Sequence, residues 1–177
     1  MTPPTPTLHM LYGNVAAGKS TLAKRLAAAP GTVLISEDHW TSHLFKEEMQ
    51  TVDDYARYSR RLRAAMGDHL VALLKAGLSV VLDFPANTVA NRQWMRGIFE
   101  AAGAAHCLHV LDVPDDVCRA RLRQRNAEGT HAFAATDEEF DIITSYIVMP
   151  SEAEGFETIV YRLDETTGLP LPDGKRR

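Results

Sequence analysis

Nine residues near the start of the chain have the types and spacing of a phosphate-binding loop. They read Gly13-Asn14-Val15-Ala16-Ala17-Gly18-Lys19-Ser20-Thr21 and fit the pattern G-x-x-x-x-G-K-[ST]. The two glycines let the backbone turn, so that several N–H groups converge on phosphate oxygens at the positive end of a following helix. We expect Lys19 to reach the β- and γ-phosphates and Ser20 to take one position on a Mg²⁺ ion. The alternative is a glycine turn that merely precedes an ordinary helix.

Two acidic residues follow short apolar runs further along the chain. Asp38 lies just after the run Thr32–Ser36, and Asp83 directly closes the run Leu78–Leu82. Ligand-facing residues of open α/β sheets lie at the carboxyl ends of strands. Apolar residues that end on an acid form a Walker B arrangement, in which the Asp83 carboxylate holds Mg²⁺ directly or through water. The alternatives are that Asp38 caps the following helix and that Asp83 caps or turns the chain before Pro85.

A helix that begins near Asp115 is rich in arginine and precedes a weakly periodic segment. Arg121 and Arg125 lie four residues apart on this helix and therefore share one face, which a solvated basic face would also explain. We expect residues 126–136 to form a mobile loop. His131 lies in that loop and is a weaker candidate for substrate contact.

Strand and helix signals alternate from Leu8 onward and define the fold class. The order β-α-β-α-β-α-β-α-α-β predicts an α/β/α fold of three layers, with a five-stranded parallel sheet and helices on both faces. Right-handed crossovers then place the glycine loop, Asp38 and Asp83 along one edge of the sheet. The expected strands are 8–12, 32–36, 78–82, 106–113 and 157–163, and the helices are 22–29, 52–76, 88–102, one from 115 and one from 136.

The remaining segments carry weaker signals. Residues 40–50 are irregular in pattern, and the composition beyond Asp164 suggests a frayed tail over 164–177 that follows a single domain, 1–163. Several side chains have a binding interpretation and a plain one. Asn91 and Arg92 would touch substrate or be surface polarity, and Trp40, Tyr55 and Tyr58 would line the pocket. The group Arg57, Arg60, Arg61 and Arg63 would form a solvated face, or one or two of its members would face a phosphate-bearing substrate. His106 and His109 are three apart in a strand, on opposite faces, which argues against a shared metal.

Composition limits the classes of protein and partner. The chain has 177 residues, a formal net charge of −4 and a pI near 6.0. This balance argues against nucleic acid or an anionic membrane as the main partner, although a local basic groove is compatible with it. Cys107 and Cys118 are the only cysteines, and neither a secretory leader nor a membrane span is recognisable. We therefore expect a soluble, cytoplasmic protein of one domain, and the oligomeric state stays open.

Taken together, these features resemble P-loop kinases of the nucleoside-monophosphate-kinase-like fold. The chain is more closely similar to the AAA-type ATP-binding proteins grouped with zeta toxins and chloramphenicol phosphotransferase, over roughly residues 8–163. The resemblance implies that the loop and Lys19 bind ATP while Ser20 and Asp83 serve Mg²⁺. It also implies that Asp38 orients or deprotonates the acceptor hydroxyl, and that Arg121 and Arg125 are lid arginines that close over the transferring phosphoryl group.

The sequence favours an ATP-dependent phosphotransferase that acts on a hydroxyl of a small-molecule acceptor. Adenine is preferred over guanine because the sequence has no Asn-Lys-x-Asp motif. Two alternatives stay open. One is a 5′-polynucleotide kinase, against which the acidic net charge counts. The other is a nucleotide-binding switch that hydrolyses ATP without transfer to a small acceptor.

Overall fold

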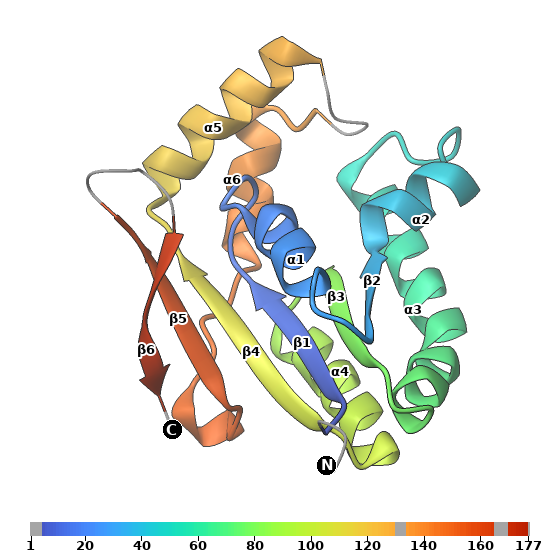
Figure 1. The fold of residues 1–177 in the computed structure, drawn as a ribbon. Helices are drawn as coiled ribbons and strands as arrows, with labels where there is room; N and C mark the ends of the chain where they lie inside the picture. Colours follow the sequence, from blue (N-terminus) through green and yellow to red (C-terminus); the bar gives the residue numbers. More distant parts are fainter. Residues whose placement is uncertain (1–4, 130–133, 165–169, 177) are drawn as a thin grey trace.

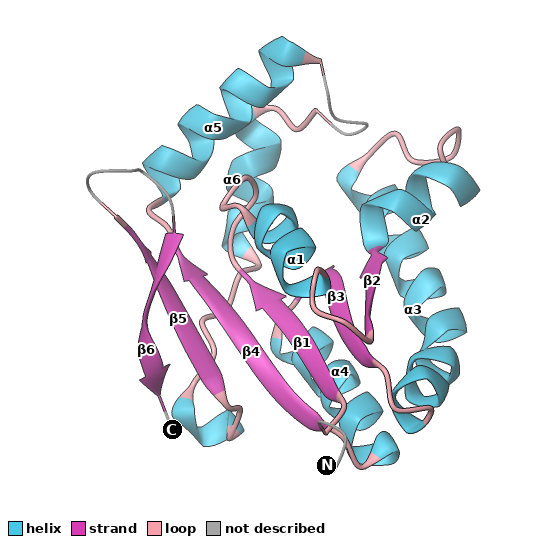
Figure 2. Ribbon diagram, viewed as in Figure 1, coloured by secondary structure: helices cyan, strands magenta, loops and turns pink. Residues whose placement is uncertain are grey.

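The computed structural model describes residues 5–129, 134–164 and 170–176, which form one sheet with helices packed on both sides. The strands and helices are shown in Figures 1 and 2. Their bounds are β1 Thr7–Tyr12, α1 Lys19–Ala27, β2 Thr32–Ser36, α2 Glu37–Leu44, α3 Val52–Lys75, β3 Ser79–Pro85, α4 Val89–Ala102, β4 Ala105–Asp112, α5 Asp115–Glu128, α6 Asp137–Ser145, the 3₁₀ turn η1 Glu152–Glu154, β5 Thr158–Leu163 and β6 Pro170–Arg176.

The sheet has the strand order β2-β3-β1-β4-β5-β6. Strands β1 to β5 are all parallel, so the predicted parallel sheet is confirmed. Parallel strands end at one edge, and this edge carries the segments that follow β1, β2, β3 and β4. The sheet topology therefore brings the glycine loop and both acidic residues to the same side of the molecule.

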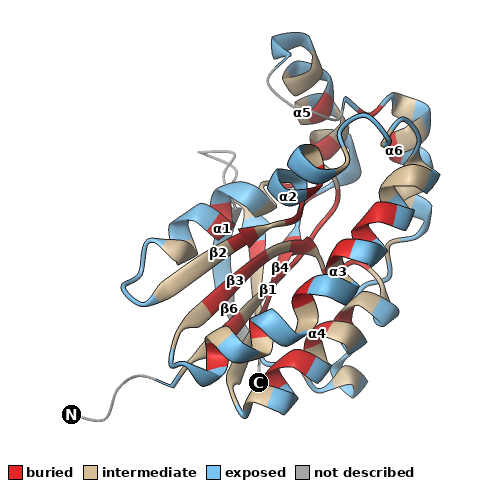
Figure 3. Cartoon of the chain, turned by 90° about the vertical axis from the view of Figure 1, so that its right-hand side faces the viewer, coloured by how far each residue is buried: buried red, intermediate tan, exposed pale blue. Residues whose placement is uncertain are grey.

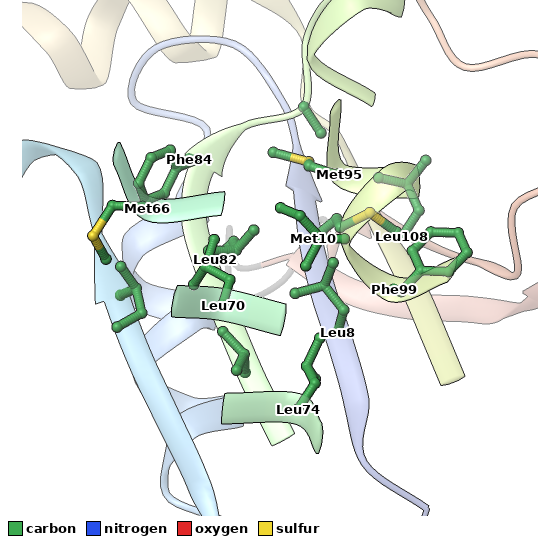
Figure 4. Packing of buried hydrophobic residues seen from close by; sticks show 14 of the residues in the cluster. Leu8, Met10, Met66, Leu70, Leu74, Leu82, Phe84, Met95, Phe99 and Leu108 are labelled. Carbon is green, nitrogen blue, oxygen red and sulfur yellow. The ribbon is translucent and has the colours of Figure 1, made fainter. Parts of the chain in front are cut away.

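Two buried clusters hold the layers together (Figure 3). In the first, Leu8 and Met10 of β1 face α3 and α4, where they meet Leu70 and Met95 (Figure 4). The next residue of the pleat, Leu11, points to the other face and packs with residues of α1, α5 and α6. Burial on both faces explains why the central strands are almost continuously apolar.

Local capping chemistry sets the helix boundaries that the sequence predicts. Thr51 and Asp54 form a reciprocal capping box at the start of α3, and Thr88 caps α4 through the Asn91 amide. Helix α4 ends at Gly103, which adopts a left-handed conformation with φ 64°. Among the described residues, no helix is both long enough and apolar enough to cross a bilayer.

The segment after β2 differs from its expected irregular structure. It forms helix α2 directly from Glu37, with Ser36 as the N-cap and two acidic residues in the first turn. The Thr41 hydroxyl donates to the Glu37 carbonyl at 2.9 Å, so the polar side chains stabilise the helix locally. Carboxylates near a helix N-terminus also interact favourably with its dipole. The helix is short and its apolar residues show little helical periodicity, so the sequence did not predict it.

Strand β3 also differs from the prediction, which ended it at Asp83. The strand continues through Pro85, and a register shift between Met10 and Leu11 accommodates the extension. The Ala86 amide then donates to the Leu11 carbonyl at 2.8 Å. A proline is tolerated at a strand end because no ladder hydrogen bond depends on its nitrogen there.

The expected frayed tail is wrong for residues 170–176, which form β6. This strand pairs antiparallel with β5 and adds a sixth, edge strand to the sheet. Its two prolines and one glycine argue against a strand when only the sequence is considered. An edge strand tolerates proline, however, because half of its backbone groups need no partner. Arg162 of β5 pairs with Asp173 of β6 at 2.7 Å.

Arg92 is neither a substrate contact nor a surface residue. Its side chain is fully buried and pairs with Glu154 through two hydrogen bonds of 2.7 and 2.9 Å. Its remaining terminal nitrogen donates to the carbonyls of Ala86 and Val148, each at 2.9 Å. Arg92 therefore ties α4 to the segment that follows α6 and to η1.

We predict that Arg92→Leu lowers the free energy of unfolding by about 3 kcal/mol, because one carboxylate and two carbonyls lose a buried partner together. Urea unfolding followed by circular dichroism measures this loss. Arg162→Leu removes an exposed ion pair on β5 and serves as the matched control, with a loss below about 1 kcal/mol. Equal losses in the two variants would contradict the anchoring role of Arg92.

Candidate phosphate-binding site

The glycine loop joins the end of β1 to the start of α1. Its last residue before the helix, Gly18, is the N-cap of α1 and is left-handed, with φ 103°. No side chain of the described residues caps α1, and its first turn holds no acidic residue. No acidic residue of the helix itself therefore offsets the positive end that faces the loop, which is the arrangement that binds an anion.

A side chain after β3 holds the first residue of this loop. The Gly13 amide donates to Asn87 Oδ1 at 3.0 Å, and Asn87 Nδ2 donates to the Gly13 carbonyl at 2.9 Å. A Cβ at Gly13 would lie 3.1 Å from the Leu111 Cβ and 3.2 Å from the Ala17 Cβ. Glycine is required there because the loop passes close to β4. The phosphate-binding pattern does not include Asn87, so the sequence did not indicate this contact.

The second residue of the loop, Asn14, is buried and joins the loop to two helices. Its side-chain nitrogen donates to Asp115 Oδ1 at 2.8 Å and to Thr144 Oγ1 at 2.9 Å. Its oxygen accepts from the Val15 amide at 2.7 Å. The pattern leaves this position unspecified, so sequence reasoning did not find the role of Asn14. A buried amide fixes the loop from the side of α5 and α6.

Lys19 lies folded against the loop that it follows. Its ammonium donates to the carbonyls of Gly13 and Asn14, each at 2.7 Å. Burial lowers the pKa of Lys19, while the charges of Asp83 and Asp38 act in the opposite direction. Both carboxylates thus lie within electrostatic reach of this ammonium group.

Asp83 lies within β3, opposite Ser36 of β2 in the strand register. The Ser20 hydroxyl donates to its carboxylate. Burial raises the pKa of Asp83, whereas the hydrogen bond from Ser20 and the charge of Lys19 lower it. The structure thus joins the two residues that the sequence proposed as magnesium ligands. Asp83 is part of a strand and does not cap a helix.

Asp38 is the second residue of α2 and is exposed at the same edge of the sheet. Ser36 is the N-cap of α2, so Asp38 does not have the capping role considered as its alternative. The Tyr55 hydroxyl donates to Asp38 Oδ1 at 3.4 Å. The Asp38 charge also acts on Lys19, Asp83 and Arg125, so these three groups lie within electrostatic reach of its carboxylate.

Its neighbour Glu37 has a different environment and was not singled out from the sequence. Glu37 is buried, accepts from Arg63 at 3.0 Å and accepts from the Tyr55 hydroxyl at 2.8 Å. Burial raises the pKa of Glu37, and the charge of Arg63 acts in the opposite direction. Arg63 also donates to Asn91 Oδ1 at 2.7 Å. Arg63 therefore does not belong to the solvated face that we expected.

Two other residues were expected to line the pocket. Tyr58 is buried and stacks on Phe45 with ring centroids 4.6 Å apart, so it belongs to the packing of α3. Trp40 is 39% exposed on α2. Of the three aromatic residues considered, Tyr55 is the one that contacts the acidic pair through its hydroxyl.

Two arginines of α5, Arg121 and Arg125, belong to the candidate site, whereas Arg119 and Arg123 pair with acidic residues of α6. Arg121 donates to the Ala17 carbonyl at 3.5 Å. Burial lowers the pKa of Arg125, and the charge of Asp38 opposes that shift. The Nε atom of Arg125 is buried and has no hydrogen-bond partner among the described residues. A buried N–H without a partner is costly, so an acceptor supplied by a ligand would satisfy it.

The lid predicted over residues 126–136 is only partly described. Residues 126–128 continue helix α5, and the Asn126 side chain donates to the Ala135 carbonyl at 2.8 Å. His131, the residue considered for substrate contact, lies outside the described residues. Its role stays a prediction from the sequence.

The arrangement fits a nucleotide triphosphate with Mg²⁺ on chemical grounds. The loop and the start of α1 offer amides and the Lys19 ammonium group to phosphate oxygens, and α5 adds the unpartnered Arg125 Nε. Ser20 and Asp83 offer the hydroxyl and carboxylate oxygens that Mg²⁺ prefers. The cationic donors therefore lie along the loop and on α5, and the carboxylates lie apart from them at the ends of β2 and β3.

Comparison with protein families assigns this domain. Residues 8–150 match the model of an AAA domain family, AAA_33, and the chain belongs to that family. It therefore has a P-loop domain, as the residues Gly13–Thr21 predicted. No curated protein sequence matches the chain.

Solved structures share the fold at low sequence identity. A kinase-like protein from Chloroflexus aurantiacus, described as a putative kinase, superposes with a TM-score of 0.73 at 19% identity, over 92% of this chain and 87% of that one. A sugar kinase from Janibacter sp. gives 0.62 at 18% identity, over 90% and 86%. The APS kinase of Mycobacterium tuberculosis, solved with AMPPNP and APS, gives 0.60 at 19% identity, over 92% and 91%. These similarities establish the P-loop α/β fold.

We predict that Asn87→Asp lowers the free energy of unfolding by about 1–3 kcal/mol. The substituted carboxylate can still accept from the Gly13 amide, but it presents an oxygen to the Gly13 carbonyl where a donor is needed. Chemical denaturation measures the change. Gln93→Glu, an exposed amide-to-acid change on α4, should stay within about 0.5 kcal/mol. An unaffected Asn87→Asp protein would show that the two hydrogen bonds do not hold the loop.

Proposed function

We propose that this protein is an ATP-dependent kinase that transfers the γ-phosphoryl group to a hydroxyl of a small-molecule acceptor. The observation that carries this proposal is that Lys19, Asp83 and Arg125 all lie within electrostatic reach of Asp38, with Lys19 at the start of α1. Phosphoryl transfer needs alignment and charge neutralisation more than covalent help, and these four groups supply both.

The loop residues bind the phosphates of ATP. Amides at the start of α1 donate to the β- and γ-phosphate oxygens, and Lys19 exchanges its two carbonyl partners for the same oxygens. Arg125 donates its unpartnered Nε to the γ-phosphate, with Arg121 next to it at the loop. The side chains of Asn87 and Asn14 already hold the loop backbone, so the main rearrangement on binding is the turn of Lys19 from its two carbonyl partners to the phosphates.

Ser20 and Asp83 hold Mg²⁺ in this proposal. Their hydrogen bond places a hydroxyl and a carboxylate oxygen side by side. An ion held there would supply positive charge that neutralises the β- and γ-phosphates. Ser20 would offer it an oxygen lone pair in place of its hydrogen bond to Asp83.

Asp38 positions the acceptor hydroxyl and takes its proton. The hydroxyl oxygen forms a bond to the γ-phosphorus, the bond from that phosphorus to the β-γ bridging oxygen breaks, and ADP leaves. The proton of the hydroxyl goes to the Asp38 carboxylate. The Tyr55 hydroxyl, which contacts Asp38 and Glu37, fixes the carboxylate at the edge of the site.

A small acceptor is supported over a nucleic acid by charge and by the chemistry beside Asp38. The chain carries a net charge of −4, which gives no general attraction to a polyanion. Beside Asp38, Glu37 holds the Tyr55 hydroxyl and the Arg63 guanidinium, which are polar groups of the kind that orient a hydroxylated molecule. Two of the similar structures are described as a sugar kinase and an APS kinase, whose names indicate small acceptors.

The test is a screen of sugars, nucleosides, aminoglycosides and nucleotide-sugars with γ-labelled ATP and Mg²⁺. A labelled, phosphatase-sensitive product with one acceptor class supports the proposal. ATP hydrolysis that no acceptor accelerates and that a protein partner does accelerate would contradict it and favour a switch. Labelling of 5′-hydroxyl oligonucleotides alone would favour a polynucleotide kinase.

We predict that Lys19→Ala weakens ATP binding by about ten- to a hundredfold, because a charge-assisted hydrogen bond contributes about 1.5–3 kcal/mol. Isothermal titration calorimetry with a non-hydrolysable ATP analogue measures the change. Lys75→Ala, which removes an exposed lysine at the end of α3, is the control and should bind like the native protein. Unchanged affinity in Lys19→Ala would show that the loop is not the nucleotide site.

We predict that Asp38→Asn keeps ATP affinity within about twofold and reduces phosphoryl transfer to the identified acceptor by about two orders of magnitude. The amide has nearly the shape of the carboxylate but cannot take the proton. Rates at saturating ATP and acceptor measure this. Asp68→Asn on the exposed side of α3 is the matched control. A parallel loss of ATP binding would make Asp38 structural.

A further inference from the structure

Three potential metal ligands lie together on the face of the sheet that carries α1. His9 is in β1, and Cys107 and His109 are in β4, where His9 and Cys107 are direct partners in the parallel register. Cys107 and His109 are two residues apart and therefore share a face of the sheet. One ligand atom of each residue lies within 4.8 Å of those of the other two.

The group is separate from the phosphate site. His9 precedes Gly13 by four residues, which is roughly 13 Å along an extended strand at about 3.3 Å per residue. None of its three residues belongs to the glycine loop or to the acidic pair at the carboxyl edge of the sheet. The proposed kinase chemistry therefore makes no use of these side chains.

The distances are close to those of a tetrahedral site. His9 Nδ1 lies 3.0 Å from His109 Nε2. Zinc bond lengths of about 2.0–2.1 Å to nitrogen and about 2.3 Å to sulfur place tetrahedral ligands about 3.3 Å apart for two nitrogens and about 3.6 Å apart for nitrogen and sulfur. The nitrogen pair is about 0.3 Å closer than this, and the Cys107 sulfur lies within 4.8 Å of a ligand atom of each imidazole, so modest side-chain rotations would bring the three atoms to one ion.

A further contact orients the buried histidine. His109 Nδ1 lies 2.9 Å from the Tyr161 hydroxyl, which leaves Nε2 directed at His9. A hydrogen bond to the distal nitrogen is the usual support of a metal-binding imidazole. Burial lowers the pKa of His9 and lowers that of His109 to about 4.

A plain alternative is a hydrogen bond between two neutral imidazoles. That bond would account for the separation of 3.0 Å between His9 and His109. It does not account for a thiol at the same place, on the strand position opposite His9. Two imidazoles and a thiol are a ligand set that selects zinc-like ions and disfavours Mg²⁺.

We propose that His9, Cys107 and His109 bind a divalent transition-metal ion of the zinc class, with the remaining position open to water. Three protein ligands and one open position are compatible with tetrahedral Zn²⁺. His9 and Cys107 are partly exposed, so an ion reaches the site without unfolding of the sheet. The bound ion would connect β1 to β4, the two central strands of the sheet, and stabilise the folded chain.

The test is a Co²⁺ titration of the full, tag-free chain after chelator treatment, followed by displacement with Zn²⁺. Co²⁺ in a tetrahedral site with a thiolate gives visible d–d bands and a near-ultraviolet charge-transfer band. We expect one equivalent of Co²⁺ to produce both features and one equivalent of Zn²⁺ to remove them. Absence of bound Co²⁺ at this ratio would overturn the proposal.

Variants assign the ligands. Cys107→Ser should abolish the charge-transfer band. His9→Asn should lower the affinity for Zn²⁺ by at least about tenfold, because even the loss of a residue that only supports a metal ligand lowers metal affinity by about tenfold or more. Cys118→Ser replaces the other cysteine, and His106→Gln replaces a histidine on the opposite face of β4. Both controls should keep the native spectrum. A spectrum that Cys107→Ser leaves unchanged would contradict the site. It would show that Co²⁺ binds elsewhere, for example at His39 and His43 of α2, whose ring centroids lie 4.4 Å apart.

The outcome is independent of the proposed kinase activity. Lys19→Ala should bind Co²⁺ with the native spectrum, because the metal ligands lie at the other end of β1. Failure of ATP binding with intact Co²⁺ binding would therefore refute only the kinase proposal. Intact ATP binding without Co²⁺ binding would refute only the metal site.

Discussion

The candidate site depends on the two hydrogen bonds by which Asn87 holds the backbone of Gly13. They fix the point at which the chain leaves β1 and turns into the loop, and Asn14 fixes the next residue against α5 and α6. Three separate parts of the fold thus determine the direction of the amides at the start of α1. Donors fixed before a ligand arrives need no reorganisation, which is the main source of electrostatic catalysis in phosphoryl transfer.

The two adjacent acids after β2 show how the fold separates similar side chains. Glu37 is buried and bonded to Arg63 and Tyr55, so its carboxylate joins α2 to α3. Asp38 is exposed toward Lys19 and Arg125. The difference follows from one step of a helix, which turns neighbouring residues by about 100°. Glu37, which joins the two helices, therefore positions Asp38, which faces the site.

Local and contiguous features were predictable from the sequence. The motif Gly13–Thr21, the apolar strands and the helix caps at Thr51 and Thr136 act within a few residues of chain, and the fold class and the P-loop family followed from them. The bond between Asn87 and Gly13 joins residues 74 apart, and that between Arg92 and Glu154 joins residues 62 apart. No local pattern encodes such pairs, because they depend on the register of the sheet. Strand β6 was missed for the same reason, since pairing with β5 overrides its proline content.

The central claim is that the loop and the start of α1 bind the terminal phosphates of a nucleotide. The most direct measurement compares the dissociation constants of ATP, ADP, AMP and adenosine for the full chain in the presence of Mg²⁺. The account predicts that affinity falls at each step as phosphates are removed, and most from ADP to AMP, where the β-phosphate that the loop surrounds is lost. Adenosine bound as tightly as ATP would contradict the account.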